Sequence, residues 1–199
     1  LSFDEIESAL RPGQTVVDTT TGAPDRVERT GDRLARRGVR YIDATVGGSS
    51  QQARDGDVII MCGGDAESFS GCKPLLEVLA GQTFHLGPTG SGSRMKLVLN
   101  LVIGLNRAVL GEALSFAKAC GIEPETALEV LKSGPAWSRV MDTKGEKMLT
   151  GDFEPQARLA QHLKDVRLMN EAGVVVGAAM PLSQLHERLL QSLVDAGLG

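Results

Sequence analysis

The chain has 199 residues, 42% of them hydrophobic, and a formal net charge of −4 from 21 basic and 25 acidic residues. This length and apolar content suffice for one large domain or two modest ones with buried cores, which argues against disorder. The charges are dispersed, and no basic block could neutralise a run of phosphates, so nucleic acid is disfavoured as a partner. Apolar runs such as 58–62 and 97–105 fall short of the roughly 20 residues that span a bilayer, so we predict a soluble protein without membrane contact.

Cysteine and histidine usage disfavours disulfides and metal sites. An odd number of cysteines with no CxxC pair is a poor disulfide framework, so we expect reduced thiols in a cytoplasmic protein. The histidines are far apart in the sequence and no HExxH spacing occurs, so no metal site is predicted. Because the chain begins with Leu1 and lacks a signal-peptide pattern, we expect a fragment or a processed chain.

The first 90 residues alternate between strand and helix patterns. Residues 3–10 resemble the end of a helix, and a polar loop is expected over 47–56. The remaining patterns predict strands at 15–18, 40–44, 57–62 and 83–86 and helices at 25–37 and 66–79. Strands separated by helices imply an α/β arrangement with a partly parallel sheet.

The remainder of the chain has helical patterns only. A long apolar helix without proline is predicted over 94–120, about 40 Å long at 1.5 Å per residue. Glycine and proline punctuation then predicts further helices at 123–133, 136–149, 156–176 and 181–196. We therefore predict an α/β domain over 1–90 and an all-helical domain over 91–199, with the boundary in the loop 87–93.

One motif at this boundary suggests chemistry. The segment GSGSRMKLVLN fits the pattern GxGxxxKxxxN with Gly90, Gly92, Lys96 and Asn100. Its glycines would let the backbone approach a ligand, and the start of the helix would offer free amides to a carboxylate. Lys96 and Asn100 are four residues apart and share a helix face. Because desolvation disfavours a charged lysine, Lys96 is suited to exchange a hydroxyl proton near neutral pH; the alternative is a solvated lysine beside a core.

With this motif and three others in the same order, the sequence resembles the β-hydroxyacid dehydrogenase family. That family includes 3-hydroxyisobutyrate dehydrogenases, tartronate semialdehyde reductases and, more distantly, 6-phosphogluconate dehydrogenases. The other three segments are DTTTGAP (18–24), DATVGGS (43–49) and the Lys164, Asp165, Val166 triplet. The resemblance covers nearly the whole chain and implies a partial Rossmann-like, 6-phosphogluconate-dehydrogenase-like α/β domain followed by an all-α domain.

The resemblance also implies roles for individual residues. Lys96 would be the general acid/base, with Asn100 as its substrate-binding neighbour. Thr20 would lie beside the nicotinamide portion of NAD or NADP, and Lys164 would reach the cofactor from the helical domain. The loop Gly47, Gly48 and Ser49 would bind the substrate carboxylate. The implied activity is NAD(P)-dependent interconversion of a short β-hydroxyacid and its semialdehyde, in a homodimer or higher homo-oligomer assembled through the helical domain.

The sequence departs from the family at several of these positions. In DATVGGS, Thr45 stands in place of proline, Gly47 in place of serine and Ser49 in place of the second glycine. Backbone amides at Gly47 and Gly48, or the Ser49 side chain, would partly replace the missing serine hydroxyl. The family's opening GxGxxG turn is absent before Thr15, so weak cofactor binding is expected of these 199 residues alone.

Other interpretations stay open at the sequence level. One alternative is that Thr20 or Thr21 caps the helix that follows. Trp137 and Arg139 either line a substrate cleft or pack in a core. An imine reductase on the same scaffold is a rival enzyme, although retention of Lys96 counts against it. A rival of another class is a catalytically impaired fragment that acts as a dimerising structural module through the long apolar helix.

Overall fold

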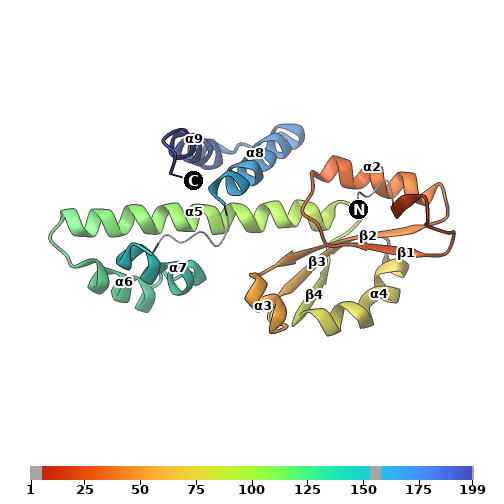
Figure 1. The fold of residues 1–199 in the computed structure, drawn as a ribbon, viewed down its shortest axis with the longest axis horizontal. Helices are drawn as coiled ribbons and strands as arrows, with labels where there is room; N and C mark the ends of the chain where they lie inside the picture. The colour runs from red at the N-terminus through yellow and green to blue at the C-terminus, as the bar shows by residue number, and fades with distance from the viewer. Residues whose placement is uncertain (1–5, 153–157, 199) are drawn as a thin grey trace. The chain divides into compact units, whose positions relative to one another are not determined.

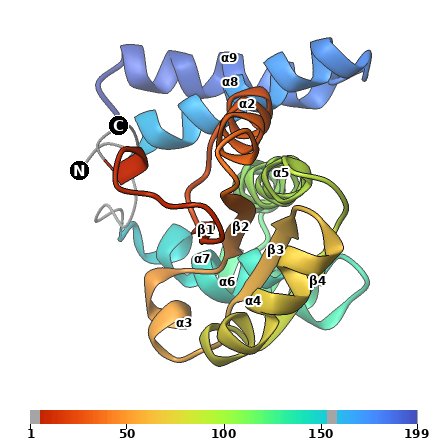
Figure 2. The ribbon, with the colours of Figure 1, turned by 90° about the vertical axis from the view of Figure 1, so that its right-hand side faces the viewer.

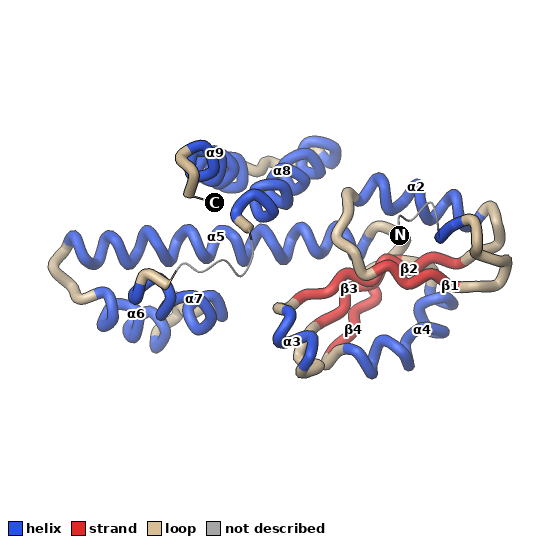
Figure 3. The backbone as a smooth tube through the Cα atoms, viewed as in Figure 1, coloured by secondary structure: helices blue, strands red, loops and turns tan. Residues whose placement is uncertain are grey.

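The computed structural model describes residues 6–152 and 158–198. The chain forms two compact units, Leu1–Leu99 and Asn100–Gly199. The division falls inside one long helix, α5 (Ser91–Ala119), which contributes its first nine residues to the first unit and the rest to the second. In Figure 3 all strands belong to the first unit, whereas the second unit is helical.

The first unit contains a four-stranded sheet in the order β1-β2-β3-β4. Its strands are β1 (Thr15–Asp18), β2 (Arg40–Gly47), β3 (Ile59–Gly63) and β4 (Gln82–His85). The pairs β1–β2 and β3–β4 are parallel, and β2–β3 is antiparallel, with Asp43 opposite Gly63 and Gly47 opposite Ile59. The sheet is therefore mixed, as the sequence predicted.

Helices α2 (Pro24–Ala35) and α4 (Ala66–Leu79) cover opposite faces of this sheet (Figure 1, Figure 2). Side chains alternate along β2 because successive Cβ atoms of a strand point to opposite faces. Tyr41 packs with Val27 and Leu34 of α2, whereas Ile42 packs in a second cluster with Leu76 of α4. β2 is thus buried on both sides, which positions its polar residues inside the unit.

Among its described residues, the helical unit contains the remainder of α5 and four further helices. They are α6 (Pro124–Ser133), α7 (Arg139–Thr150), α8 (Leu159–Val176) and α9 (Pro181–Asp195). Leu110 and Leu114 of α5 form a core with Leu128 of α6 and with Val140 of α7. Gly151 and Gly177 cap α7 and α8 in the left-handed conformation, so α8 ends at residue 176 as predicted and α7 ends one residue later than predicted.

Four predictions of local structure need correction. Helix α5 begins at Ser91 rather than at residue 94, so residues 91–93 of the predicted boundary loop are helical. β2 continues to Gly47 rather than ending at residue 44, because residues 43–47 pair with β3. The predicted polar loop contains a short helix, α3 (Ser50–Arg54), started by a capping box between Ser49 and Gln52. Helix α7 begins at Arg139, so Trp137 precedes it. The helix expected over 3–10 and the start of the one expected over 156–176 lie partly outside the described residues.

Candidate active site

The glycine motif forms the first turn of α5, which lies directly on the sheet. A Cβ at Gly92 would meet the carbonyl oxygen of Met61 and lie 2.8 Å from the carbonyl oxygen of Asp43. Those oxygens belong to the backbone of β3 and β2 and have little freedom to move. Gly90 has a φ of 92°, a conformation that side chains with a Cβ disfavour. Gly92 therefore allows close packing of the helix against the strands, whereas Gly90 supplies the positive φ of the turn that precedes the helix.

Amides at the start of α5 are bound by an internal carboxylate. Asp43 is 1% exposed, and its two oxygens accept hydrogen bonds from the backbone N–H groups of Gly90 and Ser93, each 2.8 Å long. The expectation that this helix start offers free amides to a substrate carboxylate is wrong for these two groups, because Asp43 already satisfies them. Burial raises the pKa of Asp43, and the hydrogen bonds from residues 90 and 93 oppose that rise.

Lys96 and Asn100 follow on the same side of α5, one turn apart, and both are half-buried. Within the helical unit, the Asn100 Nδ2 atom lies 3.4 Å from Oδ2 of Asp165 on α8. The other carboxylate oxygen of Asp165 accepts from Gln161 Nε2 at 3.3 Å. Two motifs that are 65 residues apart in the sequence therefore meet at Asn100 and Asp165. Lys164, the neighbour of Asp165, has an exposed side chain.

Thr20 is exposed just beyond the carboxyl end of β1 and is held by Asp18. Its backbone N–H and its hydroxyl both donate to Asp18 Oδ1, at 2.9 and 2.7 Å. The Tyr41 hydroxyl donates to Asp18 Oδ2 at 2.7 Å. Helix α2 has Ala23 as its N-cap with no side-chain cap, so the alternative in which Thr20 or Thr21 caps this helix does not apply. Burial, then the bond to Asp18, raises the pKa of Tyr41.

The predicted carboxylate loop follows directly from β2. A Cβ at Gly47 would lie 2.8 Å from side-chain atoms of both Ile59 and Leu99, so a serine at this position would require both to move. Gly48 and Ser49 are exposed. The Ser49 hydroxyl accepts from the Gln52 amide at 3.2 Å and caps α3. Gly48 is exposed, and no loop or turn hydrogen bond between described backbone groups involves it.

Three further polar side chains, Arg107, His162 and His186, lie near one another in the helical unit although they are far apart in the sequence. The rings of His162 on α8 and His186 on α9 are 5.2 Å apart, and both lie against Gly104 of α5. Burial, then the neighbouring His186 and Arg107, lowers the pKa of His162 to about 4. Among the described residues no group of three His, Cys, Asp or Glu side chains is placed to hold a metal ion.

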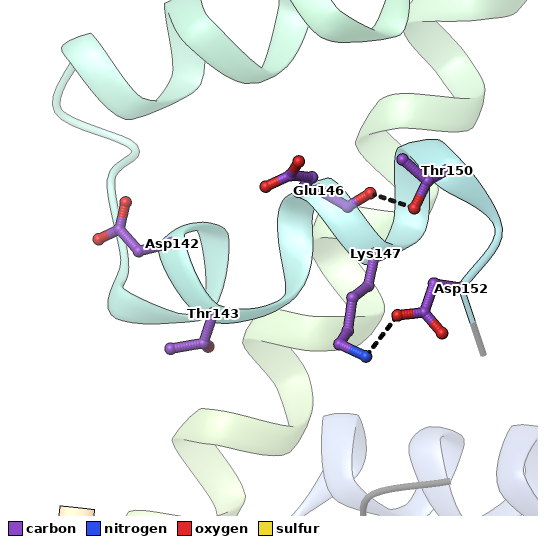
Figure 4. Close-up of a pocket in the computed structure, with 6 residues that line it drawn as sticks. All are labelled: Asp142, Thr143, Glu146, Lys147, Thr150 and Asp152. Atoms are coloured by element: carbon purple, nitrogen blue, oxygen red, sulfur yellow. Dashed lines mark hydrogen bonds and ion pairs between the residues drawn. The ribbon is translucent and has the colours of Figure 1, made fainter. Parts of the chain in front are cut away.

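A shallow polar depression on α7 lies away from these motifs in the sequence. Figure 4 shows its lining residues, which are Asp142, Thr143, Glu146, Lys147, Thr150 and Asp152. Lys147 is paired with Asp152 at 2.7 Å. The depression contains none of the predicted site residues, so we assign the chemistry elsewhere. Trp137 is exposed, and its indole N–H donates to Asp142, so the ring is not part of a core.

Sequence reasoning missed the supporting residues Asp18, Tyr41, Asp43 and Thr45. For Asp43 and Thr45 the signal was present, because an aspartate and a threonine inside the apolar run of a doubly buried strand need internal partners. Which groups they bind depended on the fold, because Gly90 and Ser93 are 47 and 50 residues from Asp43.

Comparison with known proteins matches both units. Residues 2–87 match the family model of the NAD binding domain of 6-phosphogluconate dehydrogenase. Residues 90–199 match the model described as NAD-binding of NADP-dependent 3-hydroxyisobutyrate dehydrogenase. The chain is 32% identical over 195 residues to 2-(hydroxymethyl)glutarate dehydrogenase of Eubacterium barkeri, covering 98% of this chain and 65% of that protein.

Two further relatives agree. The chain is 31% identical to 2-hydroxy-3-oxopropionate reductase of Escherichia coli, over 93% of this chain and 63% of that enzyme. A solved structure of 3-hydroxyisobutyrate dehydrogenase from Salmonella typhimurium superposes with a TM-score of 0.89 at 24% identity, over 100% of this chain and 70% of that one. The chain thus spans a little under two thirds of the two curated relatives. It belongs to the β-hydroxyacid dehydrogenase family, whose cofactor is NAD or NADP.

Proposed function

We propose that the chain contributes the proton-transfer and substrate-binding residues of an NAD(P)-dependent oxidoreductase that interconverts a short β-hydroxyacid and its semialdehyde. The observation that carries this proposal is the placement of Lys96 and Asn100 on one side of α5, with Asn100 bonded to Asp165. An amine and an amide one helical turn apart can contact the same substrate hydroxyl.

The residues present fit part of a dinucleotide site. Thr20 is exposed beyond the carboxyl end of β1, where ligands of open α/β sheets bind, and Lys164 exposes an ammonium that suits a phosphate or ribose. We assign Thr20 and Lys164 to the binding of NAD or NADP. The Thr20 hydroxyl donates a hydrogen bond to Asp18, so its oxygen lone pairs can accept a hydrogen bond from a ligand.

The bound cofactor would supply the hydride acceptor for oxidation and the hydride donor for reduction. During oxidation, the neutral Nζ of Lys96 takes the proton from the substrate hydroxyl as the C–H bond of the same carbon breaks. During reduction, the Lys96 ammonium returns that proton to the carbonyl oxygen. Asn100 orients the hydroxyl, and its bond to Asp165 limits the rotation of its amide.

The substrate carboxylate would be bound by the loop Gly47, Gly48 and Ser49. Gly48 is an exposed residue, as binding through its backbone would require, and the Ser49 hydroxyl can donate to a carboxylate while it accepts from Gln52. The names of the two enzyme relatives describe acids with an alcohol or aldehyde on the β carbon. A hydroxymethyl or formyl carboxylate is therefore the class of substrate that we assign.

A self-associating module is the second candidate, and it is compatible with the first. The α9 helix exposes Leu182, Leu185, Leu189 and Leu193 at helical spacing. A second copy of the chain is the partner that we assign to this stripe, since closed dimers use the same patch on both subunits. Self-association without dinucleotide binding would favour the structural module.

The long apolar helix α5 bears on where the protein is located. Among the described residues, α5 is long and apolar enough to cross a membrane by length and composition. Its first turn is bonded to β2, and its Leu110 and Leu114 pack against α6 and α7, so part of its surface is covered within the protein. We propose that α5 does not span a membrane and that the protein is cytoplasmic.

The test compares Lys96→Ala with wild type and with Lys118→Ala, an exposed lysine of the same helix. We expect Lys96→Ala to lower turnover of a hydroxymethyl carboxylate by a factor of about 10² to 10⁴ while NAD(P)H titration is unchanged. Unchanged turnover in Lys96→Ala would remove this residue from the mechanism. An imine substrate is tested in parallel, and reduction of the imine in place of the hydroxyacid pair would favour an imine reductase.

A further inference from the structure

One face of β2 runs along the first turns of α5. Residues 43, 45 and 47 point to the same side because side chains of a strand alternate. Asp43 and Thr45 are 1% and 0% exposed, and Gly47 lies against Leu99 of α5. β2 therefore contacts α5 both at Gly92, which precedes Lys96 in the sequence, and at Leu99, which follows it.

Asp43 and Thr45 bind this helix in complementary ways. Asp43 accepts from the N–H groups of Gly90 and Ser93, both at 2.8 Å. Thr45 donates its hydroxyl proton to the carbonyl oxygen of Gly92 at 2.9 Å, with the Met61 carbonyl farther away at 3.3 Å. An acceptor and a donor on one rigid strand, bound to opposite kinds of backbone group, restrict both translation and rotation of the helical turn.

The Thr45 bond leads directly to Lys96. In an α-helix the carbonyl of residue 92 is the acceptor for the N–H of residue 96. The Gly92 oxygen can bind both groups because a carbonyl has two lone pairs. Thr45 therefore holds the peptide group to which the backbone of Lys96 is hydrogen-bonded, and it does so from a fully buried position.

We propose that Asp43 and Thr45 are positioning residues for Lys96, and that their bonds to the first turn of α5 fix the place from which its side chain reaches the substrate. The inference rests on the proposed function, in which Lys96 exchanges a proton with the substrate hydroxyl. A displacement of about 1 Å in a reacting group costs on the order of 10²-fold in rate, so the anchoring of this turn has kinetic consequences.

The experiment uses three substitutions of similar size. Thr45→Val keeps the shape and loses the donor, whereas Thr45→Ser keeps the donor and loses a methyl group. Thr83→Val on β4 is the matched control, because the Thr83 hydroxyl is buried without a partner among the described residues. We expect Thr45→Val to lower kcat by about 10- to 100-fold with little change in KM, Thr45→Ser to restore most of it, and Thr83→Val to resemble wild type.

A second readout does not depend on turnover. Each variant is treated with an acetylating reagent over a range of pH, and the modification rate of Lys96 relative to Lys118 is measured by peptide mass spectrometry. A change in the relative rate or in its pH profile in Thr45→Val, reversed in Thr45→Ser, supports the positioning role even if wild type turns over no hydroxyacid. That combination would count against the proposed function alone.

Hydrogen exchange at the Gly90 and Ser93 amides supplies the structural control. If Asp43→Asn and Thr45→Val accelerate this exchange but leave kcat, KM and the relative Lys96 modification rate at wild-type values, the bonds stabilise the fold only and the inference is overturned. It is also overturned if Thr45→Ser is as impaired as Thr45→Val, since the hydroxyl would then not be the responsible group.

Discussion

The Asn100 amide nitrogen lies 3.4 Å from a carboxylate oxygen of Asp165, so the two most informative motifs of the helical half meet in one side-chain pair. The distance exceeds that of a strong N–H···O bond, so the pair guides the amide rather than fixing it. The other carboxylate oxygen of Asp165 also accepts from Gln161 of the same helix, at 3.3 Å.

Loss of the Asp165 carboxylate should impair orientation of the substrate hydroxyl. We expect Asp165→Ala to lower kcat/KM by about 10- to 100-fold, because Asn100 is then free to rotate. Gln161→Ala, which removes a partner of Asp165 and keeps the carboxylate, should lose much less. Steady-state kinetics of the two variants checks this, and equal losses would show that Asn100 does not depend on Asp165.

Half-buried His162, beside buried His186, should make stability depend on pH. The pKa of His162 is lowered from 6.5 to about 4 by burial, His186 and Arg107. Between these values the unfolded chain binds more protons, so the free energy of unfolding should rise with pH across this window and fall as acid is added. Solvent screening limits the contribution to about 1 to 2 kcal/mol.

Denaturant unfolding of wild type and His162→Gln at several pH values isolates this contribution by difference. The glutamine variant carries no charge at any pH and should have a smaller slope between pH 4 and 6.5. The contribution of Asp43 is the same in both proteins and cancels in the difference. Its raised pKa would change the free energy of unfolding in the opposite direction, because burial disfavours its charged form in the folded state. Parallel curves would mean that His162 is not the titrating group.

The Tyr41 hydroxyl should stabilise the β1 end of the proposed cofactor site. Tyr41→Phe removes a 2.7 Å bond to Asp18, whose carboxylate also holds Thr20. We expect a loss of about 1.5 to 3 kcal/mol in the free energy of unfolding, the range for hydrogen bonds to a charged group, together with weaker dinucleotide binding. Chemical denaturation and NAD(P)H titration measure the two effects, and unaltered values of both would contradict the assignment.

Two glycines of α5 should respond oppositely to alanine. At Gly92 a Cβ meets backbone oxygens of β2 and β3, so Gly92→Ala should cost at least about 2 to 3 kcal/mol. At Gly111 no atom lies within 4 Å of an added Cβ, so Gly111→Ala should stabilise the helix by roughly 0.5 to 1 kcal/mol. Thermal unfolding of both variants provides the comparison, and similar shifts in Tm would be inconsistent with the packing of the first turn.

The leucine stripe of α9 should mediate self-association. Leu189→Glu places a charge at the centre of the stripe and should shift the protein to a smaller species in analytical ultracentrifugation, with unchanged helix content. Gln184→Glu, on the same helix but not in the stripe, is the matched control. If wild type is already monomeric over the measured concentrations, the stripe does not bind a second copy.

The sequence alone determined the order of most elements and the separation into a mixed α/β part and a helical part, whereas the roles of Lys96, Asn100, Thr20 and Lys164 stay predictions. These follow from local periodicity, from glycine and proline punctuation and from short motifs, each of which is contained within a few neighbouring residues. The assignment of residues 1–90 and 91–199 as domains stays a prediction, since the two compact units of the structure divide after Leu99.

Only the tertiary structure decided which groups support those residues. Asp43 and Thr45 were visible as polar residues in a buried strand, but their partners at Gly90, Gly92 and Ser93 come from a segment about 50 residues later. Likewise, His162 and His186 were two separate histidines until the packing of α8 and α9 brought their rings within 5.2 Å. Local patterns carry no information on such pairs, because hydrogen bonding and desolvation act between neighbours in space.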